Sequence, residues 1–305
     1  MSTEYIHFTT EQREAARQTD LVALLQSQGE QLKRSGKEYV WRDGSEKVTV
    51  RGNLWFHQYE RIGGDAVDFV RRFYNMDFPQ AVNFLLGNNG GALPRAEPVK
   101  REPPKPFTLP PKNDNMRRVY AYLLNRRGID RKVLSAFVHK GMIYESADYH
   151  NAVFVGYDEH GIARHAHKRG TGSESTYKGN AESCDPRYSF HWTGTDNALY
   201  LFEAPIDMLS FISLHKENWH SHSYAAACCV GDQVLFQMLK ADPNIDTVCL
   251  CMDNDTAGQA ANKRISDKLF IQGIKHEILV PEFKDWNEDI LCDEQEETEC
   301  QTLQL

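Results

Sequence analysis

The sequence predicts an α/β protein whose C-terminal third forms a mostly parallel, Rossmann-like sheet, with regions of mixed α+β structure before it. Short apolar runs alternate there with helical patterns, as in parallel sheets whose strands are joined by helices. Each run is followed by acidic residues, and a stretch rich in proline and glycine separates this part from the N-terminal region. The runs are Leu199–Phe202, Ala225–Asp232 with its closing Gly-Asp, Val248–Met252, and the strand that begins at His276.

The run that ends at Met252 is the most informative, because it leads into two carboxylates. Its apolar residues predict a buried strand, followed by Asp253, Asp255, the turn residue Gly258 and a helix. Alternate residues at a strand end point the same way, and parallel sheets bind ligands at the C-terminal ends of their strands. Two such carboxylates attract a hard cation such as Mg²⁺. The alternative is a solvated loop in which the aspartates are turn and capping residues.

A second acidic position follows the run that ends at Phe202. Glu203 stands at the end of this strand, and Pro205 favours the first turn of a helix. Asp207 lies four residues after Glu203, and the last apolar run leads to Asp285. Four strand–acid units in a row argue against a chance arrangement.

In this pattern the chain resembles the TOPRIM domain, which DnaG-type primases, topoisomerases and some nucleases share. The resemblance implies a TOPRIM domain over residues 196–290 that binds Mg²⁺ or Mn²⁺, with Glu203 as the general acid/base or a further metal ligand. Primases of the family often have a second aspartate where this chain has Asn287. The implied catalytic residues are Glu203, Asp253 and Asp255, and the implied metal-binding residues are Glu203, Asp207, Asp253, Asp255 and Asp285.

The segment before the TOPRIM domain resembles the primase core. The tyrosine-leucine helix and Arg-Gly-Ile of 120–137, the two strands of 150–170, and the stretch 176–183 carry this resemblance. It implies a mixed α+β primase-core subdomain over residues 115–195. Its basic and amide side chains would bind the nucleotide and the template. The implied residues are Arg164, Lys168, Arg169, Lys178 and Asn180.

The N-terminal region, residues 1–87, resembles the α+β zinc-ribbon domain of primases. A helical pattern at 20–29 precedes short strands, a Gly-Gly turn and an amphipathic helix within 37–73, and 76–87 continues the resemblance. Structural zinc needs about four cysteine or histidine ligands, and residues 1–183 contain no cysteine. We therefore expect a ribbon without zinc, in which His57 is a lone histidine. The aromatic residues expected to hold its sheet together are Trp41, Trp55, Phe56 and Tyr59.

Two segments are expected to lie outside the domains. Residues 88–114 are rich in proline and glycine and predict a semi-extended linker. Residues 291–305 form an acidic tail, which is typical of a solubilising or partner-docking segment. Basic residues cluster within 117–132 and 164–178, although the formal net charge is −8. This combination indicates a basic cleft beside an acidic pocket and salt-sensitive binding of nucleic acid.

The resemblance as a whole points to a DnaG-like primase of mobile elements, which synthesises short primers by Mg²⁺-dependent nucleotidyl transfer. The implied partners are a single-stranded DNA template, nucleoside triphosphates, and a helicase or other replication protein. A TOPRIM-type nuclease and a catalytically silent nucleic-acid adaptor are the alternatives. No apolar run is long enough for a membrane span, the N-terminus lacks the apolar core of a signal peptide, and the cysteine usage is typical of a reduced, cytoplasmic protein.

Overall fold

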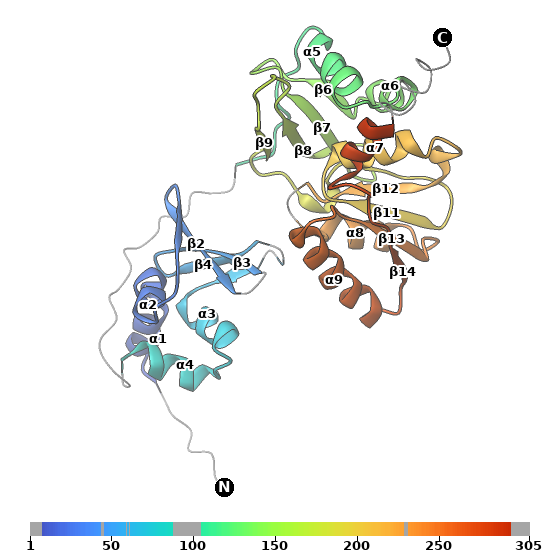
Figure 1. Ribbon diagram of the computed structural model, residues 1–305. Helices are drawn as coiled ribbons and strands as arrows, with labels where there is room; N and C mark the ends of the chain where they lie inside the picture. Colours follow the sequence, from blue (N-terminus) through green and yellow to red (C-terminus); the bar gives the residue numbers. More distant parts are fainter. Residues whose placement is uncertain are drawn as a thin grey trace, which may run out of the picture. The chain divides into compact units, whose positions relative to one another are not determined.

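The computed structural model shows a chain that folds as two compact units, Met1–Pro103 and Pro104–Leu305. Each unit has its own sheets and its own hydrophobic core (Figure 1). In the described part of the chain, no helix is both long and apolar enough to span a membrane. The structure describes residues 8–43, 46–58, 60, 62–87, 105–228 and 231–293.

The first unit is an antiparallel five-stranded sheet, in the order β1-β2-β3-β4-β5, with helices packed on one face (Figure 1). Side-chain caps begin each helix; Asp65 and Asp77, for example, each form a capping box. The elements are α1 (Thr10–Arg17), α2 (Leu21–Ser27), β1 (Lys33–Ser35), β2 (Glu38–Asp43), β3 (Glu46–Arg51), β4 (Leu54–His57), β5 (Gly63–Gly64), α3 (Ala66–Phe73) and α4 (Phe78–Leu85). The predicted Gly-Gly turn is thus a short edge strand.

Aromatic packing joins the sheet of the first unit to α3, as the sequence predicts for Trp41 and Trp55. The Trp41 ring lies 5.3 Å from Phe69 and 5.1 Å from Phe73, and the Trp55 ring lies 5.2 Å from Phe73. Most of these contacts are tilted or edge-to-face, the geometry that the ring quadrupoles favour. Both tryptophans are buried, so they supply much of the apolar contact between sheet and helices.

The prediction was wrong for Phe56, which is 36% exposed on the opposite face of the sheet. Side chains alternate along a strand, so Trp55 and His57 point into the core and Phe56 points away from it. His57 is buried and stacks on Phe73, and Tyr59 lies outside the described residues.

The second unit begins with an antiparallel four-stranded sheet, in the order β6-β7-β8-β9. Asp158 and Ile162 close the turn between its central strands, where the sequence predicts one. Helical segments pack on the face of this sheet that belongs to the main core. The elements are α5 (Arg117–Tyr120), the π-helix η1 (Ala121–Arg126), α6 (Arg131–His139), β6 (Ile143–Glu145), β7 (Ala152–Tyr157), β8 (Ala163–Arg169) and β9 (Lys178–Asn180).

The predicted linker, residues 88–114, extends too far toward the C-terminus. Phe107 and Leu109 pack against the second face of the β6–β9 sheet. The Tyr144 hydroxyl donates a hydrogen bond to the Pro110 carbonyl at 2.6 Å. A proline-rich segment can cover a sheet in this way because its carbonyls still accept hydrogen bonds. Residues 105–114 therefore belong to the second unit, and 88–104 lie outside the described residues.

The C-terminal sheet confirms the predicted mostly parallel α/β fold. Its strand order is β10-β12-β11-β13-β14, and only β10 runs antiparallel to its neighbour. A further helix covers 286–293. The elements are the 3-10 helix η2 (Pro186–Tyr188), β10 (His191–Trp192), β11 (Ala198–Phe202), α7 (Pro205–Leu214), the 3-10 helix η3 (Trp219–Ser221), β12 (Ser223–Ala226), α8 (Gln233–Ala241), β13 (Thr247–Cys251), α9 (Thr256–Ile271) and β14 (Lys275–Ile278).

The predicted strand Ala225–Asp232 differs most from the structure in this sheet, because β12 ends at Ala226. Cys228 already has a left-handed φ of 52°, which a strand cannot contain. Asp232 occupies the N-cap position of α8, but its side chain makes no capping hydrogen bond. Its Oδ2 atom pairs instead with Lys268 Nζ at 2.8 Å, so Asp232 does not add to an acidic site.

We predict that Trp41→Ala lowers the free energy of unfolding of the first unit by about 3–5 kcal/mol, as expected for truncation of a buried tryptophan. Phe56→Ala is the matched control, because it removes an aromatic ring from the same sheet on its exposed face and should cost much less. Urea unfolding followed by circular dichroism measures both. Equal losses for the two variants would contradict the packing described here.

Candidate active site

The parallel sheet brings two of the predicted acids to neighbouring strand ends. β11 and β13 are adjacent, with Phe202 opposite Cys251, so Glu203 and Asp253 leave the sheet at the same edge. α9 then begins very close to this edge, because a Cβ atom at Gly258 would lie 2.0 Å from the Asp253 carbonyl oxygen. Glycine is thus required three residues after Asp255, which explains the spacing of the motif.

Asp253 has a buried carboxylate oxygen that is available to bind a ligand. Its Oδ1 atom is buried and has no hydrogen-bond partner among the described residues. Burial, reinforced by the negative charges of Glu203 and Asp285, raises the pKa of Asp253 to about 7. A buried polar atom without a partner costs free energy, so this carboxylate is held in an unfavourable state that a cation would relieve.

The neighbouring acids share this electrostatic strain. Burial, together with the charges of Asp253 and Asp285, raises the pKa of Asp207 well above its ordinary value. Burial also raises the pKa of Glu203, with Asp255 adding to the effect and Lys178 opposing it. The charges act on one another directly, so these five carboxylates form one electrostatic cluster. The predicted acids are thus linked by their electrostatic effect on one another.

Asp255 and Asp285 divide their oxygens between the fold and the cluster. Asp255 Oδ1 accepts the backbone N–H groups two and three residues later, at 2.9 and 2.8 Å, and so caps α9. Asp285 Oδ1 likewise accepts the N–H groups of the next helix at 3.1 and 2.9 Å. The Trp286 indole donates to the Cys251 carbonyl at 3.0 Å and ties this helix to the end of β13. Both caps use Oδ1, so the Oδ2 atom of each aspartate lies outside these capping bonds.

These residues fit a divalent cation by their chemistry. Hard cations take carboxylate oxygens, and a positive charge would reverse the mutual repulsion that raises the pKa values here. Across the described residues, no three His, Cys, Asp or Glu side chains already stand close enough to form a ready-made metal site. A cation would therefore have to draw the carboxylates together, with the unpartnered Asp253 Oδ1 as its best-placed ligand.

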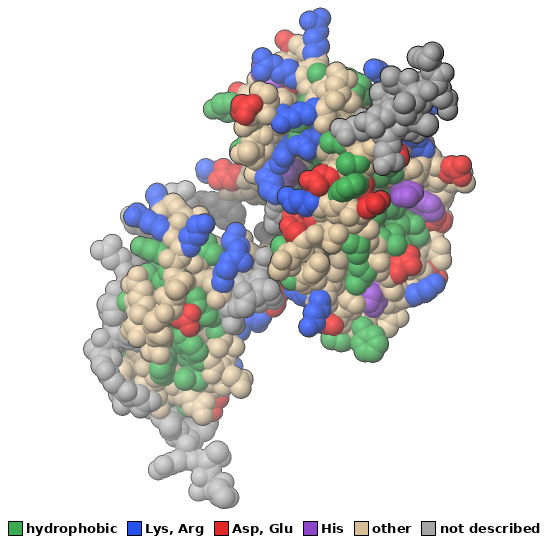
Figure 2. Space-filling view, viewed as in Figure 1, with side chains coloured by type: hydrophobic (Ala, Val, Ile, Leu, Met, Phe, Trp, Pro, Cys, Tyr) green, Lys and Arg blue, Asp and Glu red, His purple; other side chains and the backbone are tan. Residues whose placement is uncertain are grey.

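Basic side chains from the neighbouring β6–β9 sheet face this cluster. Lys178 in β9 acts electrostatically on both Glu203 and Asp253, and it pairs across the strands with Arg169 in β8. Lys284, next to Asp285, also acts on Glu203. Lys and Arg side chains form a run on the visible face of the second unit with acidic side chains beside it (Figure 2).

Two residues outside the predicted set complete the basic side. The Tyr122 hydroxyl accepts hydrogen bonds from Arg127 Nε at 3.0 Å and from Arg169 Nε at 3.3 Å. Arg127 Nη1 also donates to Asn287 Oδ1 at 2.9 Å, and the Asn287 amide donates to Ser210 Oγ at 2.9 Å. Asn287 therefore orients an arginine. The Arg-Gly-Ile motif was the available signal for Arg127, but only the fold shows its partner.

Asn180 lies in a network that joins the two sheets of the unit. Its amide donates to the Cys228 carbonyl at 2.9 Å, and its oxygen lies 2.7 Å from His167 Nδ1. Burial lowers the pKa of His167 to about 4, although the hydrogen bond to Asn180 opposes this shift. A neutral ring therefore donates to Asn180 at neutral pH, and this pair positions β9 beside the acids.

The structure places the other two predicted binding residues elsewhere. Arg164 lies at the opposite end of β8, where its guanidinium pairs with Asp158 at 2.6 Å and braces the turn. Lys168 points to the opposite face of β8 from Arg169, because side chains alternate along a strand, and its Nζ lies 5.7 Å from the Tyr177 ring centroid. Neither residue joins Lys178 at the acidic cluster.

Comparisons with known proteins agree with the TOPRIM interpretation. Residues 200–290 match the model of the Toprim-like family, which confirms the resemblance that the acids suggested. Residues 121–196 match a family described as a protein of unknown function, DUF3991. The uncharacterized protein pXO2-78 of Bacillus anthracis is 26% identical over 274 residues, which cover 85% of this chain and 79% of that relative.

Solved structures of primases are among the similar folds. The zinc-binding and RNA polymerase domains of the Aquifex aeolicus primase are 16% identical, with 96% of this chain and 84% of that chain covered and a TM-score of 0.40. The primase fragment of the bacteriophage T7 primase-helicase is 19% identical, with 67% and 84% covered and a TM-score of 0.44. At these TM-scores the likeness carries no functional argument.

We predict that Asp253→Asn stabilises the protein in a chelator above neutral pH. The raised pKa means that the folded state holds a proton that the unfolded state has lost, so stability falls as pH rises from about 4 through 7. The variant removes this loss and should raise Tm near pH 8 by roughly 2–4 °C. Differential scanning calorimetry at several pH values measures it. A wild-type Tm that rises with pH over this range, or a variant of lower Tm, would contradict the assignment.

We predict that Mg²⁺ raises the Tm of the wild-type protein more near pH 8 than near pH 5, since the carboxylates bind a cation only when deprotonated. Asp267→Asn, which changes an exposed acid on α9, is the matched control and should keep this response. Loss of the response in Asp253→Asn alone would locate the cation. An equal response in all three proteins would place it elsewhere.

Proposed function

We propose that the protein is a primase-like nucleotidyltransferase that synthesises short primers on a single-stranded DNA template, with Mg²⁺ or Mn²⁺ as its cofactor. The observation that carries the proposal is the Asp253 carboxylate, which is unpartnered at Oδ1 and lies in an acidic cluster faced by Lys178. Acids beside bases suit phosphoryl transfer, because the acids hold a cation and the bases bind phosphate oxygens. The Toprim-like match over 200–290 supports the same reaction class.

The carboxylates would divide the work between binding and proton transfer. Asp253 and Asp255, with Asp207 and Asp285 beside them, would hold the divalent cation. When bound, such a cation neutralises charge on the triphosphate. Glu203 would accept the proton of the attacking 3′-hydroxyl, and its raised pKa makes it a stronger base than an exposed glutamate.

The basic residues would bind the substrates. Arg169 and Lys178 are cross-strand neighbours at the edge of the cluster, and Arg127 is held beside Arg169 through the Tyr122 hydroxyl. Guanidinium groups bind phosphate oxygens in a fixed geometry, so this group is suited to the triphosphate and the adjoining template backbone. A helicase or another replication protein would bring the template to the enzyme.

A phosphodiester-cleaving nuclease is the main rival, since the same carboxylates serve when water replaces the 3′-hydroxyl. The basic group formed by Arg127, Arg169 and Lys178 favours the transferase, because a nuclease needs no triphosphate site. A silent adaptor would need neither an unpartnered buried carboxylate nor a raised Glu203 pKa.

The deciding experiment incubates the protein with single-stranded DNA, labelled NTPs or dNTPs, and Mg²⁺ or Mn²⁺, and separates the products on a sequencing gel. New oligomers are expected, and Glu203→Gln should reduce their rate by about 10²–10⁴-fold, the usual effect of losing a general base. Asp267→Asn should retain the rate. Shortened DNA that depends on Glu203 would establish a nuclease. If the folded protein gives neither product, the catalytically silent adaptor is the remaining interpretation.

We predict that Tyr122→Phe weakens triphosphate binding while the protein stays folded, because two arginines lose their shared acceptor. KM for the nucleotide should rise by about tenfold, which corresponds to the loss of a hydrogen bond to a charged group. Steady-state kinetics measures this change, with Tyr120→Phe, two residues earlier at the end of α5, as the matched control. An unchanged KM would show that the hydroxyl does not position the arginines.

A further inference from the structure

A pocket lies on the other face of the β6–β9 sheet, outside the acidic cluster. Its volume is about 540 Å³, and it opens beside the turn that joins β6 to β7. Lys168 lines it, whereas Arg169 on the opposite face belongs to the site described above. The lining residues that matter here are Arg118, Asp148, Tyr149, Lys168, Thr171 and Tyr177.

Two exposed aromatic rings distinguish this pocket. The Tyr149 side chain is 88% exposed and Tyr177 is 46% exposed. Lys168 and Arg118 add two positive charges against the single negative charge of Asp148. Exposed rings beside cations are what single-stranded nucleic acid needs, because bases stack on the rings and phosphates pair with the cations.

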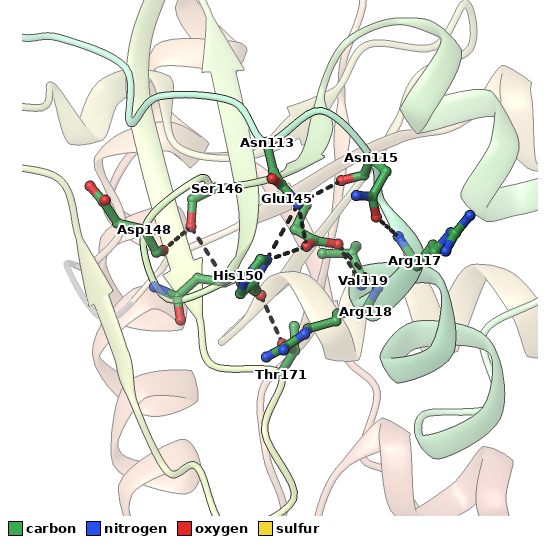
Figure 3. A network of polar contacts seen from close by, with 11 residues as sticks. Asn113, Asn115, Arg117, Arg118, Val119, Glu145, Ser146, Asp148, His150 and Thr171 are labelled. Carbon is green, nitrogen blue, oxygen red and sulfur yellow. Dashed lines mark hydrogen bonds and ion pairs between the residues drawn. The ribbon is translucent and has the colours of Figure 1, made fainter.

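The turn that carries Tyr149 is strained and rigid. Tyr149 and His150 have φ values of 60° and 52°, a left-handed conformation that costs free energy outside glycine. Hydrogen bonds hold it: Ser146 Oγ donates to the Asp148 carbonyl at 2.6 Å, and Thr171 Oγ1 donates to the His150 carbonyl at 2.7 Å (Figure 3). Strained backbone of this kind clusters at active sites and ligand-binding sites.

A buried carboxylate anchors the turn to the helix that carries Arg118. Glu145 accepts the Asn113 amide at 2.8 Å and the Arg118 backbone N–H at 3.1 Å, and it lies 2.7 Å from His150 Nδ1 (Figure 3). Thr171 and Arg118 both line the pocket. The pocket walls are therefore fixed relative to one another before any ligand binds.

The loop that carries Tyr177 is fixed as well. It folds back so tightly that a Cβ atom at Gly170 would lie 1.9 Å from Ser175 Oγ. The Gly170 N–H donates to the Tyr177 carbonyl at 2.9 Å, and Arg126 Nη1 donates to the Gly172 carbonyl at 2.9 Å. A preformed pocket loses little conformational entropy when it binds.

We propose that this pocket binds single-stranded nucleic acid, with bases stacked on Tyr149 and Tyr177 and the adjoining phosphates paired with Lys168 and Arg118. It would hold the strand at a distance from the acidic cluster, and its role as a template grip rests on the proposed function. The binding itself needs neither the cation nor the carboxylates.

The test measures the affinity of the full-length protein for a fluorescein-labelled oligothymidylate of about ten nucleotides by anisotropy, in EDTA. Tyr149→Leu and Tyr177→Leu should each weaken binding by roughly tenfold, the effect of losing one stacked base. Lys168→Gln should lower the slope of log affinity against log salt by about 0.7, as for one phosphate contact on a single strand. Phe270→Leu, another highly exposed ring, and Lys263→Gln are the matched controls on α9.

Bromodeoxyuridine in the oligonucleotide, cross-linked by light and mapped by mass spectrometry, should mark Tyr149 or Tyr177. Unchanged affinity in all pocket variants would overturn the proposal, even if the protein makes primers. Pocket variants that weaken the affinity for ATP but not for the oligonucleotide would overturn it too, because they would define a free-nucleotide site. Weaker binding by these variants in a protein that makes no primers would support the pocket and refute the proposed function.

Discussion

The repulsion among the partly buried carboxylates at one end of the parallel sheet is the constraint on which the rest of the site depends. Each acid is placed there by a structural need: Asp255 and Asp285 cap helices, and Glu203 and Asp253 follow paired strands. Capping oxygens cannot move without releasing their helices, and Gly258 holds α9 against the strand end. The fold therefore cannot disperse these charges, and a cation is the simplest way to balance them.

The antiparallel sheet supplies the opposite charge and is joined to the acidic edge by hydrogen bonds. Asn180 reaches the Cys228 carbonyl, and Asn287 reaches Arg127, which lies 160 residues away in the sequence. These contacts place bases beside acids. The opposite face of the same sheet carries the pocket with Tyr149 and Tyr177. One face of the sheet thus adjoins the acidic cluster and the other forms the proposed strand-binding pocket.

The sequence alone predicted the parallel sheet and the acids at its edge, because strand periodicity and strand-end position follow from local pattern. It could not show that Arg169 lies beside the acidic cluster and Lys168 does not. Adjacent side chains point to opposite faces of β8, and the sequence does not show which face lies toward the acids. It assigned Arg164 to the template, although Asp158 six residues earlier is its partner. Tyr122 was missed because its role depends on the hydrogen bond from Arg169, which is distant in the sequence. Residues 105–114 were predicted to be part of the linker because of their high proline content. That composition gave no sign that Phe107 and Leu109 pack against a sheet.

The most direct test of the account is a crystal structure grown with Mn²⁺ and recorded at the manganese absorption edge. We predict one strong anomalous peak within coordination distance of Asp253 Oδ1, with Glu203 or another carboxylate of the cluster as a second ligand. A well-ordered cluster without a peak, or a peak only at other acidic residues, would contradict the claim that repulsion among these carboxylates makes this edge a cation site.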